Sequence, residues 1–565
     1  MTVFAGIINI RGERVQPEEF DTLGSSFSES CCSKSYFKIE KCNSVLLFHD
    51  VGAFRDSKVA VKGNCTTVIA GDPIIRDNVG DGLFEDIEAI NSSFCKNEMP
   101  TSLQSARGVF SGVSINELKL TYSLYTDKQG VRPIFYYIKD HLFIYSSLLS
   151  VLENSSIIDN SIDTVGLNEY LAFGYCLSDR TPYKHIKRLD KGGLLSIEQG
   201  NVSLGEYWDW SNISVSSNSV SSDAEELYSL FDEAIKCRLD NNKNAVSFLS
   251  GGLDSRVIAS QVKLNVETLH SFNFATQKSQ DNECAKIFAA QAALVHHEKI
   301  LPTLEYPNWS KLISKAISDS SDLMLDDLNP NLVWSGDGGS VSLGYVYIDN
   351  NQIDLLDGMD KQSAIESFLS TTKTVPVAGF LKQRYASKSN QFLRKSIESE
   401  YLPNKEDPSK SVYHFLMNND QKRHLQLHFE TICEHKVELL LPFFDSKFLR
   451  KIYSIPSKEL VYHKFYMQWF SFFPESARSA PWQTYPGHVP CPIDIPSDLT
   501  YQWGGKRKPR RYCDLKLFLK VRKSAVYHKY FNNGKTTLAM LLHFLGVRNY
   551  SYLVGKLKLL ENIKS

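Results

Sequence analysis

One hexapeptide, Ser250-Gly251-Gly252-Leu253-Asp254-Ser255, combines the residue types that a phosphate-binding turn needs. Its glycines let the backbone approach a ligand closely, and its serine hydroxyls can donate hydrogen bonds to that ligand. The residues that follow are predicted to form a helix, whose first turn presents unpaired N–H groups and a partial positive charge. Asp254 cannot bind an anion directly, but it can hold a Mg²⁺ ion that bridges phosphates. The hexapeptide therefore predicts a phosphate site with Asp254 as a metal ligand.

The hexapeptide is not a Walker loop, because the GxxxxGK[ST] pattern is absent. It stands between a short apolar run, Ala245–Leu249, which we predict to be a strand, and the predicted helix Asp254–Lys263. A further helix is predicted before it, over Ala224–Leu239. A strand, a glycine turn and a helix in this order begin a parallel α/β unit.

The chain before this unit has a different sequence pattern, in which short β-like runs are separated by turn-forming residues. Strands are expected within Leu118–Tyr125, Ile134–Ile138 and Leu142–Ser146, and the Ser/Asn-rich stretch near residue 215 is typical of a linker. We expect a domain over residues 1–210, a linker over 211–223, an α/β domain over 224–500 and a basic helical tail over 501–565.

The hexapeptide resembles the pyrophosphate-binding SGGxDS loop of the N-type ATP pyrophosphatases, and later segments resemble asparagine synthetase. Ser335-Gly336-Asp337-Gly338-Gly339 is similar to that family's second loop, SGEGSDE, and Leu441-Pro442-Phe443-Phe444-Asp445 to its VPFLD segment. The likeness also includes Phe272–Thr276, Asp281-Asn282-Glu283, His296-His297-Glu298, Ile455-Pro456 and His463-Lys464.

This resemblance implies that ATP, with Mg²⁺, binds at Ser250–Ser255 together with Ser335 and Gly336. It implies a reaction in which a carboxylate takes AMP, pyrophosphate leaves, and an amine then attacks the adenylated carbonyl. Asp337 becomes a candidate general base or contact to the substrate amine, and Lys464 a second candidate catalytic residue.

The first half resembles the glutaminase domain of the same family. Arg107-Gly108-Val109-Phe110 and Asp127–Tyr137 are similar to its DGMFA and RDRLGIRPLYY segments, and Glu169–Tyr175 with Tyr207-Trp208 to its closing segment. The implied fold is a two-domain α/β protein: an N-terminal-nucleophile (Ntn) αββα sandwich of the class II amidotransferase type, then a parallel α/β ATP pyrophosphatase domain with a helical C-terminal extension.

The glutaminase nucleophile of the family is missing. The family begins Met-Cys-Gly-Ile, whereas the matching stretch here is Phe4-Ala5-Gly6-Ile7, so Ala5 stands in the place of the cysteine. Because alanine offers no nucleophile, we expect no glutamine hydrolysis. Thr2 would become terminal if Met1 were removed, but it lies four residues before Gly6 and would not fall where the cysteine does. The family's NGEIYN loop is also altered, to Gly71-Asp72-Pro73-Ile74.

The synthetase half departs from the pattern as well. Ser340 and Val341 stand where the second loop of the family has Asp and Glu, and Gln483 stands where it has a late lysine that would neutralise developing charge. Arg478, Lys464 or the cluster Lys506–Arg511 could replace that lysine, and Asp326 or Asp327 the missing metal ligand. The alternative is a chain without turnover.

Composition is ordinary for a globular protein of 565 residues, with 42% apolar and 22% charged residues. No run approaches the roughly 18 uncharged apolar residues of a membrane helix, and the N-terminal stretch is not typical of a signal peptide. The 11 cysteines form no CxxC pair, which favours a reducing cytoplasm. Spacing at His296-His297 is wrong for an HExxH metal site.

The net charge of −1 hides a basic tail: residues 501–565 hold 15 Lys and Arg against 2 Asp and Glu. A solvated helical face explains this, but the tail could also contact an anionic partner. The apolar and basic pattern of Leu515–Tyr530 fits a packed helix with solvated lysines or a helix on a membrane surface. Since no nucleic-acid-binding motif accompanies the cluster Lys506–Arg511, nucleic acid is not expected as a partner.

We therefore predict an ATP-dependent ligase that adenylates a carboxylate and transfers ammonia or an amine to it, without its own glutaminase activity. One alternative is an intramolecular amide-forming cyclase, similar to β-lactam synthetases and lasso-peptide cyclases. Another is amidation of a sugar acid in surface polysaccharide synthesis, for which the basic tail would suit a lipid-pyrophosphate-linked substrate. A third is a catalytically inactive relative that serves as a binding or scaffold protein. The sequence gives no indication of the oligomeric state.

Overall fold

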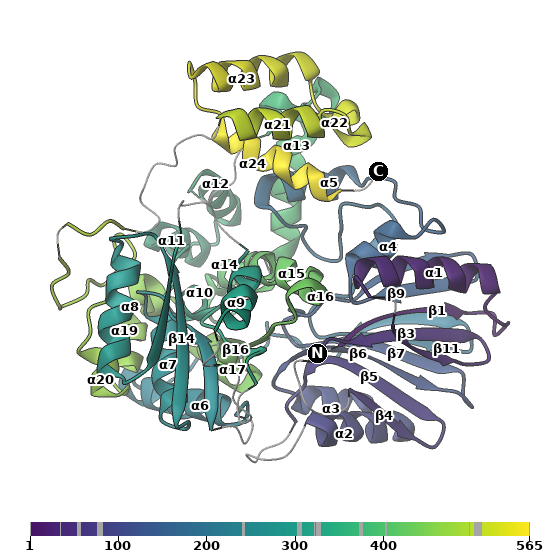
Figure 1. Ribbon diagram of the computed structural model, residues 1–565, viewed down its shortest axis with the longest axis horizontal. Coiled ribbons are helices and arrows are strands. Elements are labelled where there is room, and N and C mark those ends of the chain that lie inside the picture. Colours follow the sequence, from purple (N-terminus) through teal and green to yellow (C-terminus); the bar gives the residue numbers. More distant parts are fainter. Residues whose placement is uncertain are drawn as a thin grey trace.

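The computed structural model describes most of the chain. The described residues are 2–33, 35–52, 58–75, 83–239, 243–301, 308–320, 323, 329–371, 377–401, 404–496, 498–501 and 511–563. Figure 1 shows a β-rich half, a mixed α/β half and a helical group that caps one end of the molecule. None of the described helices combines the length and apolar character needed to cross a bilayer.

The N-terminal half is a sandwich of two six-stranded antiparallel sheets. The first has the order β10 (Ile186–Arg188), β8 (Phe135–Lys139), β9 (Leu142–Ser146), β1 (Thr2–Asn9), β3 (Ser44–Asp50) and β2 (Phe37–Glu40). The second has the order β12 (Asn201–Glu206), β11 (Gly193–Glu198), β7 (Thr121–Thr126), β6 (Val109–Asn116), β5 (Cys65–Asp72) and β4 (Val59–Lys62). Alternate residues of both sheets, such as Phe4, Leu46, Val68 and Val113, face each other in a core between them.

Helices cover both outer faces of the sandwich (Figure 1). The first sheet carries α1 (Pro17–Ser30) and α4 (Leu149–Asn154), and the second carries α2 (Leu83–Lys96) and α3 (Met99–Ser105). A further helix, α5 (Thr164–Phe173), packs against the helical part of the molecule. This arrangement confirms the predicted αββα sandwich.

The C-terminal half is built on a five-stranded parallel sheet. Its order is β15 (Val295–Ile300), β14 (Thr268–Ala275), β13 (Asn244–Phe248), β16 (Leu332–Trp334) and β17 (Glu438–Leu440), and every neighbouring pair is parallel. The chain runs outward from β13 to one edge and then returns to its other side at β16. This reversal places a topological switch point beside β13, where open α/β sheets bind their ligands.

Helices surround this sheet and continue into an α-helical region. They are α6 (Val220–Lys236), α7 (Asp254–Lys263), α8 (Gln280–Gln291), α9 (Trp309–Ser318), α10 (Gly339–Leu343), α11 (Asn350–Asp357), α12 (Lys361–Thr371), α13 (Gln383–Glu400), α14 (Lys410–Phe415), α15 (Gln421–Glu430), α16 (Ile432–His435), α17 (Ser446–Ser454), α18 (Ser457–Leu460), α19 (Lys464–Phe470) and α20 (Glu475–Arg478). Short 3₁₀ or π segments lie among them: η2 (Ala378–Phe380), η3 (Leu416–Asp420), η4 (Pro442–Phe444) and η5 (Val461–His463).

The predicted helical extension is present. It consists of α21 (Arg511–Val521), α22 (Ala525–Tyr530), α23 (Asn533–Leu545), α24 (Ser551–Leu559) and the short η6 (Leu560–Asn562). It docks on α13 through the backbone of Tyr530, which accepts a hydrogen bond from Lys382 N (2.9 Å), and on α5 through Lys556 Nζ, which donates to Ala172 O (2.8 Å).

Several predicted elements agree with the structure and four differ at their ends; of these, the strands predicted over Ile134–Ile138 and Ala245–Leu249 are each shifted by one residue. The helix Asp254–Lys263 and the strand Leu142–Ser146 have the predicted bounds. The helix predicted from Ala224 begins earlier, at Val220, because the Ser219 hydroxyl accepts a hydrogen bond from Ser222 N and so caps it. The linker is therefore shorter than residues 211–223. The strand predicted over Leu118–Tyr125 begins only at Thr121, because Leu118 lies in the preceding turn.

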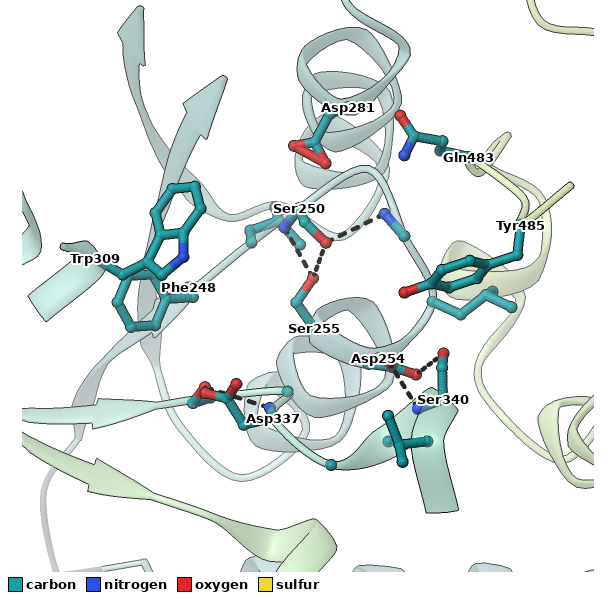
Figure 2. Close-up of a pocket in the computed structure, with 18 of the residues that line it drawn as sticks. Phe248, Ser250, Asp254, Ser255, Asp281, Trp309, Asp337, Ser340, Gln483 and Tyr485 are labelled. Atoms are coloured by element: carbon teal, nitrogen blue, oxygen red, sulfur yellow. Dashed lines mark hydrogen bonds between the residues drawn. The ribbon is translucent and has the colours of Figure 1, made fainter. Parts of the chain in front are cut away.

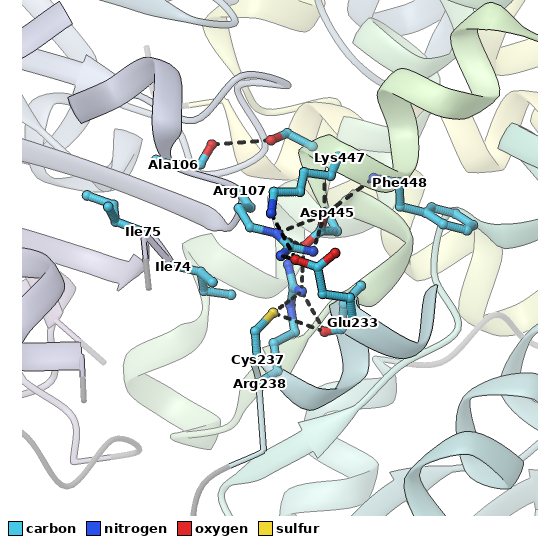
Figure 3. Close-up of polar contacts among 12 residues, drawn as sticks. Ile74, Ile75, Ala106, Arg107, Glu233, Cys237, Arg238, Asp445, Lys447 and Phe448 are labelled. Carbon is cyan, nitrogen blue, oxygen red and sulfur yellow. Dashed lines mark hydrogen bonds and ion pairs between the residues drawn. The ribbon is translucent and has the colours of Figure 1, made fainter. Parts of the chain in front are cut away.

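Buried charges join the two halves (Figure 3). The Asp445 carboxylate is fully buried and accepts hydrogen bonds from Arg107 of the sandwich (Nε to Oδ2, 3.0 Å) and from Arg238, which follows α6 (Nη1 to Oδ2, 2.9 Å). Burial alone would raise the pKa of this carboxyl, but the two guanidinium groups outweigh it and hold the pKa below its usual range. Asp445 also caps α17, since Oδ1 accepts from Lys447 N (3.0 Å).

A second set of contacts lies beside the first. Arg132 of the sandwich forms a buried ion pair with Glu438, the first residue of β17. Lys128 Nζ donates to Ser446 Oγ (3.1 Å), and Trp210 stacks on Tyr453 with ring centroids 4.7 Å apart. The two halves thus share a buried, hydrogen-bonded interface.

Replacing Asp445 with Asn is expected to lower the free energy of unfolding by about 3–5 kcal/mol, because two buried guanidinium groups would lose their counter-charge. Urea denaturation of the full-length chain measures the loss. Because the folded pKa lies below the unfolded value of about 3.9, the stabilisation is present above about pH 4 and disappears as the pH falls through the folded pKa.

Glu434→Gln is the matched control, because Glu434 pairs with Lys311 at the surface. It should cost less than about 1 kcal/mol. A loss of that small size for Asp445→Asn would contradict a structural role for the buried pair.

Candidate functional site

Two glycine turns meet at the carboxyl ends of neighbouring parallel strands. The hexapeptide Ser250–Ser255 connects β13 to α7, and the segment Ser335–Gly339 connects β16 to α10. Because β13 and β16 pair directly, the two turns emerge side by side at the switch point of the sheet. Figure 2 shows the cavity that they border.

The first turn is held by its own serines and by α8. Ser255 Oγ accepts a hydrogen bond from Ser250 N (2.8 Å), and Ser250 Oγ accepts one from Gly252 N (3.2 Å). Gly251 N donates to Asp281 Oδ1 (2.8 Å), and a Cβ on Gly251 would lie 2.5 Å from Asp281 Cα. This packing fixes the turn so that the first turn of α7 faces the cavity, with N–H groups that have no acceptor within the helix.

Glycines let the second turn lie directly against the first. A Cβ on Gly336 would be 2.7 Å from Ser255 N, and a Cβ on Gly339 would be 2.5 Å from Asp254 Cγ. Neither position could hold a larger residue without moving one of the turns. Ser335 Oγ donates to Asp337 Oδ2 (2.6 Å), and burial raises the pKa of the Asp337 carboxyl.

The Asp254 carboxylate is held by three donors. Ser340 donates through its backbone N (2.9 Å to Oδ2) and through Oγ (2.8 Å to Oδ1), and the Tyr466 hydroxyl donates to Oδ1 (3.0 Å). Burial raises the pKa of Asp254 to about 6, and the hydrogen bonds from Ser340 and Tyr466 oppose this rise. Ser340, which the sequence comparison placed where the family has an acid, thus orients the carboxylate of Asp254. A carboxylate has about four acceptor positions, so room for one further ligand is left.

His463, rather than Lys464, reaches the cavity. Its Nε2 lies 3.1 Å from Ser340 Oγ and its Nδ1 lies 2.7 Å from His488 Nδ1. Burial lowers the pKa of His463 to about 3, so the ring is neutral; because Ser340 Oγ already donates to Asp254, His463 Nε2 donates to Ser340. The backbone of His463 is in the left-handed region, with a φ of 64°. Lys464, the next residue, is exposed and does not line the cavity.

A third wall comes from the segment after α20. Buried Arg256 of α7 donates to the carbonyl oxygens of Ala480 (2.7 Å) and Pro481 (2.5 Å), and so holds this segment against the first turn. Gln483 N donates to Gly251 O (2.8 Å), and the Gln483 side chain lines the cavity, as expected for the position of the late lysine. Arg478 is exposed and does not line the cavity.

The cavity has a volume of about 700 Å³, within the range of small-molecule sites. One part of its wall is aromatic, with Phe248, Phe272, Phe274 and Trp309, and beside them lies His428, whose Nδ1 is 2.6 Å from Ser310 Oγ. The described lining residues include three aspartates, Asp254, Asp281 and Asp337, but no lysine or arginine.

The structure brings together most of the predicted site. Ser250, Gly252, Leu253, Asp254, Ser255, Ser335, Gly336 and Asp337 all line the cavity, and Gly251 lies directly behind it. Asp326, Asp327 and residues 506–510 of the basic cluster lie outside the described residues. His296 and His297 lie in the edge strand β15 and do not line the cavity.

The sequence did not identify the residues that position other side chains of the site. Arg256, Tyr466 and His488 are scattered along the chain, and each is a common core or surface type, so no spacing marks them. Asp281 and His463 were noticed only as part of a resemblance. The aromatic wall had a signal, since Phe248 and the pair Phe272 and Phe274 end the two strands beside the hexapeptide.

The place of the family's nucleophilic cysteine lies inside β1. Ala5 is fully buried there and pairs with Leu47 of β3 and Ser146 of β9. A Cβ on the next residue, Gly6, would lie 2.3 Å from the Tyr145 hydroxyl oxygen, so this side chain fills the space over the strand. Thr2 is also fully buried.

Two family models match the chain. The glutamine amidotransferase domain matches residues 85–208, and the asparagine synthase model matches residues 226–464. The asparagine synthetase [glutamine-hydrolyzing] 3 of Bacillus subtilis (strain 168) is 26% identical over 191 residues, which are 33% of this chain and 30% of the relative. The asparagine synthetase [glutamine-hydrolyzing] 1 of the same strain is 26% identical over 208 residues, 36% of this chain and 32% of the relative.

The chain thus spans about a third of the length of the curated relatives that it matches. Among solved structures, glutamine phosphoribosylpyrophosphate amidotransferase from B. subtilis, complexed with ADP and GMP, covers 43% of this chain and 54% of its own. Its identity is 12% and its TM-score 0.22, too low to support any inference.

The fold and the two matched segments define a two-domain protein in which an amidotransferase-type sandwich precedes a synthase-type α/β domain. In both segments the chain is similar to the asparagine synthetase family. This confirms the resemblance inferred from the sequence.

Gly339→Ala is expected to lower the free energy of unfolding by about 1–3 kcal/mol, because the new methyl group would lie 2.5 Å from Asp254 Cγ and force the turns apart. Thermal unfolding of the full-length chain measures this loss.

Gly555→Ala in α24 is the control, since a Cβ there meets no atom within 4 Å. In a helix interior this change should be neutral or stabilising by up to about 1 kcal/mol. Equal effects of the two substitutions would show that the turns are not in close contact.

Proposed function

We propose that this protein is an ATP-dependent carbon–nitrogen ligase that adenylates a carboxylate and transfers ammonia or another amine to the activated carbonyl. The pair of glycine turns carries this proposal. They lie at the switch point of a parallel sheet, they leave helix N–H groups facing a cavity of about 700 Å³, and their packing tolerates no side chain at Gly336 or Gly339. A turn that only connected a strand to a helix would not need such an approach.

The residues present fit a nucleotide that arrives with Mg²⁺. A triphosphate would be repelled by Asp254, Asp281 and Asp337, and none of the described lining residues is a lysine or arginine that could offset them. A divalent cation between carboxylates and phosphates removes this conflict. Within the described part of the chain, no three His, Cys, Asp or Glu side chains form a metal site by themselves. This suits Mg²⁺, which one or two carboxylates and the substrate's phosphates commonly share.

Asp254 and Asp337 are the carboxylates that would hold the ion. Asp254 has room for one more ligand, as described above. Asp337 accepts a hydrogen bond at Oδ2, and no donor to Oδ1 is found among the described residues. Asp337 is thus the more open of the two, which also suits it to contact the incoming amine.

The reaction would proceed in two steps. An oxygen of the substrate carboxylate attacks the α-phosphorus of ATP, and the bond to the β-phosphate oxygen breaks, so that pyrophosphate leaves. The nitrogen lone pair of the amine then attacks the carbonyl carbon, AMP leaves with the former carboxylate oxygen, and the nitrogen loses a proton. Asp337 is our candidate acceptor of that proton.

The nitrogen would not come from glutamine hydrolysed by this chain. Ala5 has no nucleophilic atom, Tyr145 covers the adjoining Gly6, and Thr2 is buried. Free ammonia, ammonia from a separate protein, or an amine within the substrate remain as donors. The last case includes intramolecular cyclisation, and the carboxylate could equally be that of a sugar acid.

The cysteines support a reducing compartment for this reaction. None of the 11 cysteines forms a disulfide, and this includes Cys31 and Cys433, which lie close to each other. We therefore propose a cytoplasmic location.

Asp337→Asn is expected to lower pyrophosphate release by about 10²–10³-fold, because it removes a charge at the reacting centre while keeping the shape of the side chain. The assay combines full-length protein, ATP, Mg²⁺ and a panel of amino-acid, peptide and sugar carboxylates. Asp360→Asn is the control, since Asp360 is exposed and caps α12.

The ligase proposal is refuted, and a scaffold favoured, if two results occur together. Wild type releases no pyrophosphate with any of these carboxylates, and Asp337→Asn and Asp254→Asn leave the ATP affinity unchanged.

With the carboxylate that is found, ammonium should support amide formation and glutamine should not. Ala5→Cys should fail to add glutamine dependence, because its thiol would be buried in β1 and would not be N-terminal. The measurement is glutamate release from glutamine beside amide formation. Release of glutamate by wild type at the rate of amide formation would contradict the loss of glutaminase activity.

A further inference from the structure

Helix α23 is apolar on two opposite sides. Thr536, Ala539, Met540 and His543 are buried against the rest of the extension, at the spacing of one helix face. Leu538, Leu541 and Leu545 recur with the same periodicity on the opposite face, where their exposed fractions are 58%, 50% and 61%. Figure 1 shows α23 as the outermost helix of the capping group, with no element beyond it. We call these three leucines the outer stripe.

The orientation of α23 is fixed, so the outer stripe is not a side that turns inward. His543 Nε2 lies 2.9 Å from Asp514 Oδ2 of α21, and His543 Nδ1 accepts a hydrogen bond from Tyr550 N (3.0 Å). Asn532 caps the other end of the helix by accepting from Lys535 N. The outer stripe is therefore a permanent feature of the surface.

The apolar surface continues past the stripe. Phe544 is 38% exposed, and Val547, directly after the helix, is 71% exposed. Exposed apolar residues that gather in this way mark an interaction surface, whereas single ones are ordinary. A helix that is apolar on both sides is typical of one covered on both sides.

The helical extension that carries the stripe is basic. Residues 511–563 hold ten Lys and Arg against two Asp and Glu, a net charge of +8. Lys535 lies in the first turn of α23 and Arg548 just beyond its end, and both are exposed, as are Lys516, Lys520, Lys523, Lys529 and Lys558. This charge disfavours contact with a second copy of the same surface and favours a negatively charged partner.

Within Leu515–Tyr530, Leu519 is the large apolar residue that is exposed (48%). Phe518, Val521, Tyr527 and Tyr530 are buried, and the lysines among them are exposed. That stretch is a packed pair of helices with solvated lysines, one of the two interpretations that its sequence allowed.

We propose that the outer stripe and its basic surroundings bind the surface of an anionic lipid bilayer. Leucines of a surface helix enter the boundary between headgroups and acyl chains, while flanking lysines and arginines stay among the negative headgroups. Because a bilayer is flat and fluid, an outermost helix with a leucine stripe can bind it without fitting into a groove. This proposal stands independently of the ligase activity.

The test is cosedimentation of the full-length protein with vesicles of phosphatidylcholine alone or with added phosphatidylserine. Wild type should bind the anionic vesicles and not the neutral ones, and binding should weaken as salt is added. Leu538→Gln/Leu541→Gln/Leu545→Gln should reduce binding at least about tenfold, since three leucine side chains would no longer be buried in lipid. Lys535→Gln/Arg548→Gln should reduce it about tenfold or more.

The matched control is Leu118→Gln/Leu204→Gln/Leu264→Gln, which changes three leucines of similar exposure elsewhere (77%, 61% and 61%) and should bind as wild type does. Thermal unfolding and circular dichroism confirm that each variant is folded. Wild type that stays in the supernatant with anionic vesicles overturns the proposal, and so does an outer-stripe variant that binds as wild type does. A dimer that the outer-stripe variant abolishes, without vesicle binding, would assign this face to a second copy.

Discussion

The contact between two glycine turns is the constraint on which the α/β half depends. Gly336 and Gly339 allow the turn after β16 to lie on the backbone of Ser255 and on Asp254, closer than any side chain permits. That approach puts Ser340 where it can hold the Asp254 carboxylate, and Ser340 in turn aligns His463. Asp254 cannot move without disturbing the start of α7 and the start of α10 together. The charge of the site is thus positioned by backbone packing.

Local signals were enough to predict the elements nearest this contact. The helix Asp254–Lys263 was predicted with its observed bounds, because the glycines before it and the apolar residues within it mark its start and its buried face. The αββα sandwich and the parallel sheet followed from a resemblance spread over both halves. The predicted start of α6 was wrong because a single capping residue determines it. Ser219 caps α6 inside the stretch that was expected to be a linker.

The site was predicted less completely, for a physical reason. Lys464 and His463 are neighbours in sequence, and only the three-dimensional structure shows that His463 lines the cavity whereas Lys464 is exposed. Likewise Arg256 acts by holding the chain near Pro481, more than 200 residues away. Contacts between residues so far apart in the chain leave no local pattern in the sequence. The outer stripe on α23 also needed the structure, because the sequence alone does not show which side of this helix packs against the rest of the extension.

The sandwich contributes to this site through its contacts with the α/β half. Arg132 pairs with Glu438 in β17, and Arg107 pairs with Asp445, which begins α17. Strand β17 lies beside β16, and Leu440 O accepts a hydrogen bond from Ser335 N (3.1 Å), so the anchored strand directly supports the second glycine turn. Removing the sandwich would deprive Glu438 of Arg132 and Asp445 of Arg107, so each acid would lose a guanidinium partner. The sandwich therefore has a structural role, which is to anchor strand β17, and β17 supports the turn that contains Asp337.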